Sequence, residues 1–249
     1  MLTNRRHVVR ARLLERARAD TRVTGAAITG SAAAGREDRW SDIDLFFGVT
    51  DVAAVLADFT RHLYDELGAL SHFDLTAGAA AYRGFLLENA LEVDLGFTPA
   101  EEFRSYGEAP FRVVFGRPSA PGPAHRVDLD QLAGRIWHHV LHARSSIERG
   151  RPWLAEYWIS QARFHTLTLA ADRHGLDTAY AKGADSLPEP LKASLQAGLV
   201  RDLDRRELFR ALEAVTAAAL TELRLHSEAT ADRLEETLLA LARLSPDQQ

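Results

Sequence analysis

The chain has 249 residues, enough for one large domain or two small ones, and its 46% hydrophobic and 26% charged residues are usual for a globular protein. It contains no cysteine, which excludes disulfides, thiolate catalysis and cysteine-ligated zinc. A net charge of −5 disfavours a nucleic-acid partner, and no stretch approaches the roughly 18 consecutive apolar residues of a membrane span. We therefore expect a cytoplasmic protein with neither a nucleic-acid nor a membrane partner.

The N-terminal segment carries the densest basic cluster of the chain. Apolar residues recur at helical spacing at Val9, Leu13, Leu14 and Ala17, which predicts an amphipathic helix. We expect the apolar face of this helix to pack on a neighbouring sheet and its many arginines to lie in solvent.

A short strand, a glycine and a serine follow this helix. Residues 23–29 are small or β-branched and lead directly into Gly30, which predicts a strand that ends in a turn. Ser31 then begins a short helical segment that reaches Gly35. Backbone N–H groups and a hydroxyl in such a turn can hold a phosphate, and a glycine lets the phosphate approach the main chain. Gly30 and Ser31 are therefore candidate phosphate-binding residues.

Two aspartates open the next predicted strand, beginning eleven residues after Ser31. Side chains on a strand alternate between faces, so Asp42 and Asp44 share one face while Ile43 and Leu45 enter the core on the other. Two carboxylates this close repel each other unless a cation such as Mg²⁺ lies between them. The pair is therefore a candidate metal site, although Asp-x-Asp is also common at solvated strand ends.

A third acidic candidate lies in a second alternating strand. A helix begins after Asp51, a strand near residues 70–76 follows it, and residues 82–88 are expected to form a hairpin with residues 91–97. In this last strand the apolar residues alternate with Glu92 and Asp94, which therefore share the face opposite the core. Outward acids on an alternating strand are also ordinary surface chemistry.

The order of strand, Gly-Ser turn, short helix, polar loop and Asp-x-Asp on a hydrophobic strand resembles the signature of the DNA polymerase β-like nucleotidyltransferases. The resemblance implies that Asp94 joins the two strand aspartates as a metal-binding and catalytic acid, with Asp94 or else Glu92 as the base. Ala34 stands where the family often has an arginine, so Arg36 or Arg39 would supply that phosphate contact. The dinucleotide-binding and P-loop glycine patterns are absent.

Prolines and a glycine interrupt the chain in residues 117–126, which predicts a linker between a first domain, residues 1–116, and a second, residues 127–249. In the second domain apolar residues at helical spacing predict helices from residue 129, from Pro152, from Asp204 through a capping box with Glu207, and near the C-terminus. The expected fold class is therefore α+β: a small mixed-sheet, polymerase β-like nucleotidyltransferase domain followed by an α-helical bundle.

Some side chains of the helical half invite a functional interpretation. A polar helix face is favoured over a metal site for His138, His139 and His142, because no acid joins them in the same turn. Lysine is nearly absent from the chain, so Lys182 in a predicted loop is a candidate partner for a triphosphate, with a solvated loop lysine as the alternative. The aromatic residues that follow Pro152 are expected to be core: Trp153, Tyr157 and Trp158.

A catalytic domain of this kind followed by a helical domain resembles the antibiotic nucleotidyltransferases that adenylylate aminoglycosides or lincosamides. The resemblance implies transfer of a nucleoside monophosphate from a nucleoside triphosphate to a hydroxyl of a small-molecule acceptor, with ATP the expected donor and two Mg²⁺ ions. Aminoglycosides and lincosamides are the candidate acceptors, and the resemblance does not specify whether antibiotic resistance is the physiological role. Two alternatives stay open. A protein-modifying enzyme of the antitoxin type is disfavoured by the long helical half, and a catalytically silent nucleotide-binding protein is disfavoured by the three acids. The sequence specifies no oligomeric state.

Overall fold

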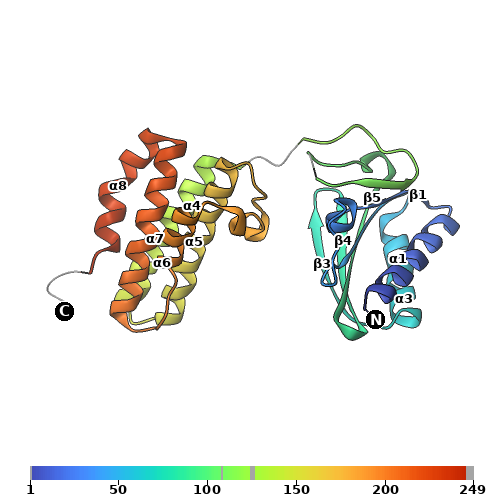
Figure 1. The fold of residues 1–249 in the computed structure, drawn as a ribbon, viewed down its shortest axis with the longest axis horizontal. Helices are drawn as coiled ribbons and strands as arrows, with labels where there is room; N and C mark the ends of the chain where they lie inside the picture. The colour runs from blue at the N-terminus through green and yellow to red at the C-terminus, as the bar shows by residue number, and fades with distance from the viewer. Residues whose placement is uncertain (1, 108, 124–126, 245–249) are drawn as a thin grey trace. The chain divides into compact units, whose positions relative to one another are not determined.

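The structure is a computed structural model that describes residues 2–107, 109–123 and 127–244. Contacts divide the chain into two compact units, Met1–His125 and Arg126–Gln249, and each unit is described by itself (Figure 1). The predicted α+β class is confirmed, because the first unit is built on a mixed sheet and the second is helical.

The first unit is a six-stranded sheet with helices against it. The strand order is β3-β4-β5-β2-β1-β6, in which β2 and β5 are parallel and every other neighbouring pair is antiparallel. In chain order its elements are α1 (Leu2–Ala19), β1 (Val23–Ile28), α2 (Gly30–Ala33), β2 (Ile43–Val49), α3 (Val52–Glu66), β3 (Ala69–Ala77), β4 (Ala80–Leu87), β5 (Leu91–Pro99) and β6 (Arg112–Phe115).

One face of the sheet is covered by α1 and α3 (Figure 1). Alternate residues of the two central strands enter this core, among them Leu45 and Phe47 of β2 and Val93 and Leu95 of β5. The period-two pattern of the sequence thus predicted the buried face correctly. The intervening residues, including the candidate acids, lie on the opposite face, part of which is a smaller core where Phe103 packs on Ala27 and Phe46.

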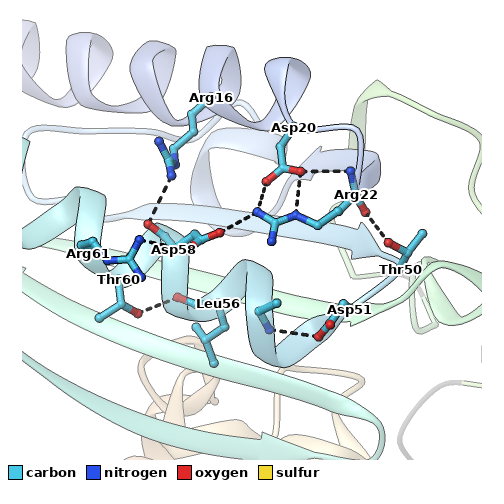
Figure 2. Close-up of polar contacts among 10 residues, drawn as sticks. Arg16, Asp20, Arg22, Thr50, Asp51, Leu56, Asp58, Thr60 and Arg61 are labelled. Carbon is cyan, nitrogen blue, oxygen red and sulfur yellow. Dashed lines mark hydrogen bonds and ion pairs between the residues drawn. The ribbon is translucent and has the colours of Figure 1, made fainter.

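A polar network joins the turn after α1 to α3 (Figure 2). The Arg22 guanidinium donates to the Asp20 and Asp58 carboxylates, each at 2.6 Å, and the Arg16 guanidinium donates to the Asp58 carbonyl at 3.4 Å. The Asp51 carboxylate caps α3 by accepting from the Ala54 N–H, as predicted. These contacts hold both helices on the same face of the sheet.

Two features of the first unit were not predicted. The edge strand β6 pairs with β1, although only four residues form it. In the predicted linker, the Ser119 N–H donates to the Phe103 carbonyl and the Gly122 N–H to the Ser105 carbonyl, so these residues pack on the first unit. Residues 124–126 of that stretch lie outside the described residues.

The second unit is a helical bundle with an apolar interior. Its helices are α4 (Leu129–Glu148), α5 (Pro152–Arg173), α6 (Glu189–Ala197), α7 (Arg205–His226) and α8 (Glu228–Ala242). Pro152 occupies the first turn of α5, where its missing N–H costs nothing. Within the described part of the chain, no helix is both long enough and apolar enough to cross a bilayer.

The predicted capping box at α7 is only half correct. The Asp204 carboxylate accepts from the Glu207 N–H at 2.9 Å, as an N-cap should. The Glu207 carboxylate does not accept from the Asp204 N–H, because it accepts from the Arg201 N–H and from the Arg210 guanidinium instead. The Asp204 N–H donates to Asp202. Competing local partners therefore replaced the reciprocal bond.

The aromatic residues of α5 and the histidines of α4 also depart from expectation. Trp153 and Tyr157 are exposed rather than core, and Trp158 is half-buried. His139 is 8% exposed, so it is not part of a polar helix face. Its ring stacks on Trp158 and on the buried His165 ring, with centroids 5.2 and 5.0 Å away. The packing of α5 on α4 buries this side of α4, and the spacing of apolar residues along one helix does not predict which helix packs on it.

The buried histidines make the stability of the second unit depend on pH. Burial, with a smaller contribution from His165, lowers the pKa of His139 to about 4, and burial also lowers the pKa of His165. Because the unfolded chain binds protons near pH 6.5, stability is complete above that pH and falls as the pH drops from 6.5 towards 4. We expect a loss on the order of 3 kcal/mol from His139 alone, at about 1.36 kcal/mol per pKa unit.

This loss can be measured by urea unfolding between pH 7 and pH 4.5. Three of the four tryptophans lie in the second unit, so a Trp40→Phe background makes tryptophan fluorescence report that unit alone. In this background His139→Phe should reduce the pH dependence of the free energy of unfolding. His174→Phe, at an exposed position, should leave that dependence unchanged. An equally steep profile in His139→Phe would contradict the assignment.

Candidate metal centre

Three carboxylates meet on the face of the sheet opposite α1 and α3. Asp44 of β2 lies directly opposite Asp94 of β5 in the parallel register, and Asp42 precedes β2 by one residue on the same face. Each offers an oxygen atom, and these three atoms lie within 4.8 Å of one another. It is the one group of three or more metal-ligating side chains found in the described residues. Half-buried carboxylate oxygens are the donors that Mg²⁺ prefers, so the residues present fit such an ion.

The Gly-Ser turn reaches this group because position 30 has no side chain. The Thr29 N–H donates to the Asp44 carbonyl at 3.1 Å, and Gly30 follows with a positive φ of 59°. A Cβ at this position would lie 1.9 Å from Asp44 Oδ2. Only glycine accommodates both the backbone angle and the close approach.

Ser31 lies in the single turn of α2, directly after Gly30. Its Oγ is buried and finds no hydrogen-bond partner among the described residues. A buried hydroxyl usually has a partner, so this atom is available to a ligand that enters the site. Arg39 is exposed on the loop before Asp42, and its guanidinium stacks over the Trp40 ring at 4.5 Å.

With this geometry in view, the chain can be compared with known proteins. No protein-family model and no curated protein matches it. Among solved structures it is similar to an aminoglycoside 6-adenyltransferase from Bacillus subtilis, with 14% identity, 92% of this chain and 95% of that chain covered, and a TM-score of 0.42. It is also similar to a nucleotidyltransferase-like protein from Exiguobacterium sibiricum, with 12% identity, coverage of 95% and 89%, and a TM-score of 0.40.

The loop that carries Asp42 is fastened to α1 by arginines. Arg6, only 2% exposed, pairs with Glu37 at 3.0 Å and donates to the Ser41 carbonyl at 2.9 Å. Both terminal nitrogens of Arg10 donate hydrogen bonds to the same carboxylate, at 2.8 and 3.1 Å. The prediction that the arginines of this helix lie in solvent is therefore wrong for Arg6 and Arg10. A contact between residues 27 or more positions apart leaves no local signal in the sequence.

Neutralising Glu37 should loosen this loop in a pH-dependent way. Hydrogen bonds from Arg10 hold the pKa of Glu37 below its usual range. The stabilisation is therefore complete above pH 4.5 and is lost as the pH falls through the lowered pKa. We expect Glu37→Gln to cost roughly 1–2 kcal/mol at pH 7, because hydrogen bonds to charged, largely buried groups exceed exposed pairs in strength. The difference in unfolding free energy between Glu37→Gln and wild type should begin to shrink near pH 4.5.

Urea unfolding monitored through Trp40, in a chain whose other tryptophans are replaced by phenylalanine, would measure this difference. Glu15→Gln removes an exposed carboxylate from α1 and serves as the control. A Glu37→Gln deficit of constant size from pH 7 to pH 3.5 would refute the ion-pair explanation.

Two other predicted site residues are not part of the carboxylate group. Glu92 lies on the same face of β5 but is exposed, two residues before Asp94, and is not among the three convergent acids. Lys182 belongs to the second unit, where it is exposed at the end of a short 3₁₀ turn. Its action on a triphosphate remains a prediction.

Sequence reasoning missed two neighbours of Asp94. Gly84 of β4 lies opposite Asp94, and Phe73 of β3 lies opposite Gly84. Glycine inside an apolar strand is the signal that points to a close approach at this position.

Proposed function

We propose that this chain is a metal-dependent nucleotidyltransferase. It transfers a nucleoside monophosphate from a nucleoside triphosphate, with ATP as the expected donor, to a hydroxyl of a small-molecule acceptor. The observation that carries the proposal is the convergence of Asp42, Asp44 and Asp94 on one face, beside a Gly-Ser turn that abuts Asp44. The first unit then holds the chemistry. Because nucleoside triphosphates are cytoplasmic metabolites, the protein would act in the cytoplasm.

Each residue has a distinct role in this proposal. Asp42, Asp44 and Asp94 would hold two Mg²⁺ ions, with Asp94 serving one of them. When bound, Mg²⁺ lowers the pKa of a coordinated hydroxyl and stabilises charge on the phosphoryl oxygens. Ser31 Oγ and the Gly30 N–H would orient the outgoing phosphates, with Arg39 and Lys182 as further cationic contacts.

The reaction itself is a balanced displacement. The acceptor oxygen forms a bond to the α-phosphorus as the bond from that phosphorus to the pyrophosphate oxygen breaks. The acceptor proton passes to the carboxylate of Asp94, which lies with the metal-binding acids, rather than to the exposed Glu92. Pyrophosphate is released as the second product.

The test is pyrophosphate release with Mg²⁺ from each nucleoside triphosphate, over a panel of aminoglycosides, lincosamides and candidate proteins. Release that depends on a small-molecule acceptor supports the proposal. Release that depends only on a protein acceptor would favour the antitoxin-type alternative. Nucleotide binding without release under any condition would favour the catalytically silent alternative.

A further inference from the structure

An exposed aromatic ring lies in the same cross-strand row as the candidate acids. The sheet register aligns Phe73 of β3, Gly84 of β4, Asp94 of β5 and Asp44 of β2 across adjacent strands. Phe73 is 52% exposed, whereas the other phenylalanines of these four strands are buried: Phe46, Phe47, Phe85 and Phe97. A half-exposed phenylalanine in this position therefore contributes little to the core.

Gly84 brings the ring next to Asp94. A Cβ at position 84 would lie 2.5 Å from the Phe73 ring and 2.9 Å from Asp94 Oδ1. The Phe73 ring and the Asp94 carboxylate oxygen therefore both border the space that a side chain at position 84 would fill. A larger residue at position 84 would displace either the ring or the acid.

The two ends of this cross-strand row have different neighbours. The Gly30–Ser31 turn adjoins Asp44, at the β1–β2 end, and Phe73 adjoins Asp94, at the β4–β3 end. In phosphoryl transfer the attacking and leaving oxygens lie roughly in line on opposite sides of the phosphorus. If the pyrophosphate leaves at the Gly30–Ser31 end, the acceptor approaches from the Phe73 end.

We propose, on the basis of the proposed function, that Phe73 is the platform on which a ring of the acceptor rests while its hydroxyl meets Asp94. The acceptor chemistry that fits is a saturated, amino-substituted ring. Its C–H groups and nearby ammonium groups are attracted to the electron-rich face of the phenyl ring. Leu75, two residues along the same strand and 52% exposed, extends the apolar surface. A nucleobase platform is the competing interpretation, and it predicts a different kinetic result.

The experiment compares the steady-state constants of wild type with those of Phe73→Ala, Phe73→Leu and Phe73→Tyr. The probes are MgATP and whichever of kanamycin, streptomycin or lincomycin supports the fastest pyrophosphate release. We expect Phe73→Ala to raise the acceptor KM about tenfold and to change the ATP KM less than twofold. Phe73→Tyr should keep the wild-type constants, and Phe73→Leu should resemble Phe73→Ala because it lacks a flat ring. Val113→Ala, on the opposite edge strand β6, is the control.

The failures of the two proposals are distinguishable. An acceptor KM that is unchanged in Phe73→Ala, or an ATP KM that rises by the same factor, overturns the platform and leaves the transferase intact. Turnover with a protein acceptor but with none of the ring compounds overturns both the platform and the small-molecule acceptor of the proposed function, and leaves only the nucleotidyl transfer. A wild-type protein that releases no pyrophosphate with any acceptor overturns both. Thermal melts of each variant verify folding, which truncation of a half-exposed side chain should not impair.

Discussion

Replacement of Asp44 by asparagine is expected to reduce acceptor-dependent pyrophosphate release by at least about 10³-fold. A bound metal ion contributes several kcal/mol of charge stabilisation, and each 1.36 kcal/mol is a factor of ten in rate. The metal-free variant should be as stable as wild type or more so. Asp42, Asp44 and Asp94 crowd within 4.8 Å, and the substitution removes one member of this like-charged group.

Magnesium provides a readout that does not depend on turnover. A ligand that binds only the folded state raises the melting temperature, by more the further its concentration exceeds the Kd, so Mg²⁺ should stabilise wild type and not Asp44→Asn. Glu92→Gln is the matched control, because it neutralises an exposed carboxylate on the same face of β5. We expect it to keep both the Mg²⁺ effect and turnover within about tenfold of wild type. Clear destabilisation of metal-free Asp44→Asn, or inactivity of Glu92→Gln, would contradict these assignments.

The face of the sheet opposite α1 and α3 shows what a sequence pattern can and cannot predict. Strand alternation is local, so it correctly predicted that Asp94 points away from the core formed by Val93 and Leu95. The pairing of Asp94 with Asp44 depends on the parallel neighbours β2 and β5, which are separated by two other strands in the sequence. Alternation within one strand carries no information about register with another, so the resemblance alone suggested the third acid.

Long-range contacts explain the remaining differences. The burial of Arg6 requires a carboxylate, Glu37, from a loop that lies beyond β1. Phe73 lies over a glycine of the next strand, and this relation appears only once β3 and β4 are paired. In each case an ordinary residue acquires its role from a partner that the local pattern does not identify.

The interior of the helical unit contains a similar long-range pair. Periodicity correctly predicted leucines such as Leu212 and Leu223 in α7 as core. It did not predict that Glu222 of α7 is also buried, with 2% of its side chain exposed. Two nitrogens of Arg173, from α5, bind this carboxylate at 3.0 and 3.1 Å. The arginine side chain is 29% exposed, so the two partners are unequally solvated.

This inequality predicts unequal costs for removing either charge. Arg173→Ala leaves a carboxylate buried without its cation, and we expect a loss of about 3 kcal/mol, the lower end of the range for a broken buried pair. Glu222→Gln should cost less, because the arginine that remains can turn to water. The double variant Arg173→Met with Glu222→Met should recover most of the loss, since apolar side chains of similar length fill the same space without a desolvation penalty.

Urea unfolding in the Trp40→Phe background measures these differences for the second unit alone. Arg224→Ala is the control. This arginine lies on α7 with Glu222 but pairs with carboxylates whose side chains are 61% and 42% exposed, those of Asp232 and Glu235, so its removal should change little. If Arg173→Ala and Glu222→Gln cost the same, burial does not decide the energetics of the pair. If the double variant is less stable than either single one, the ion pair itself stabilises the bundle and the desolvation argument fails.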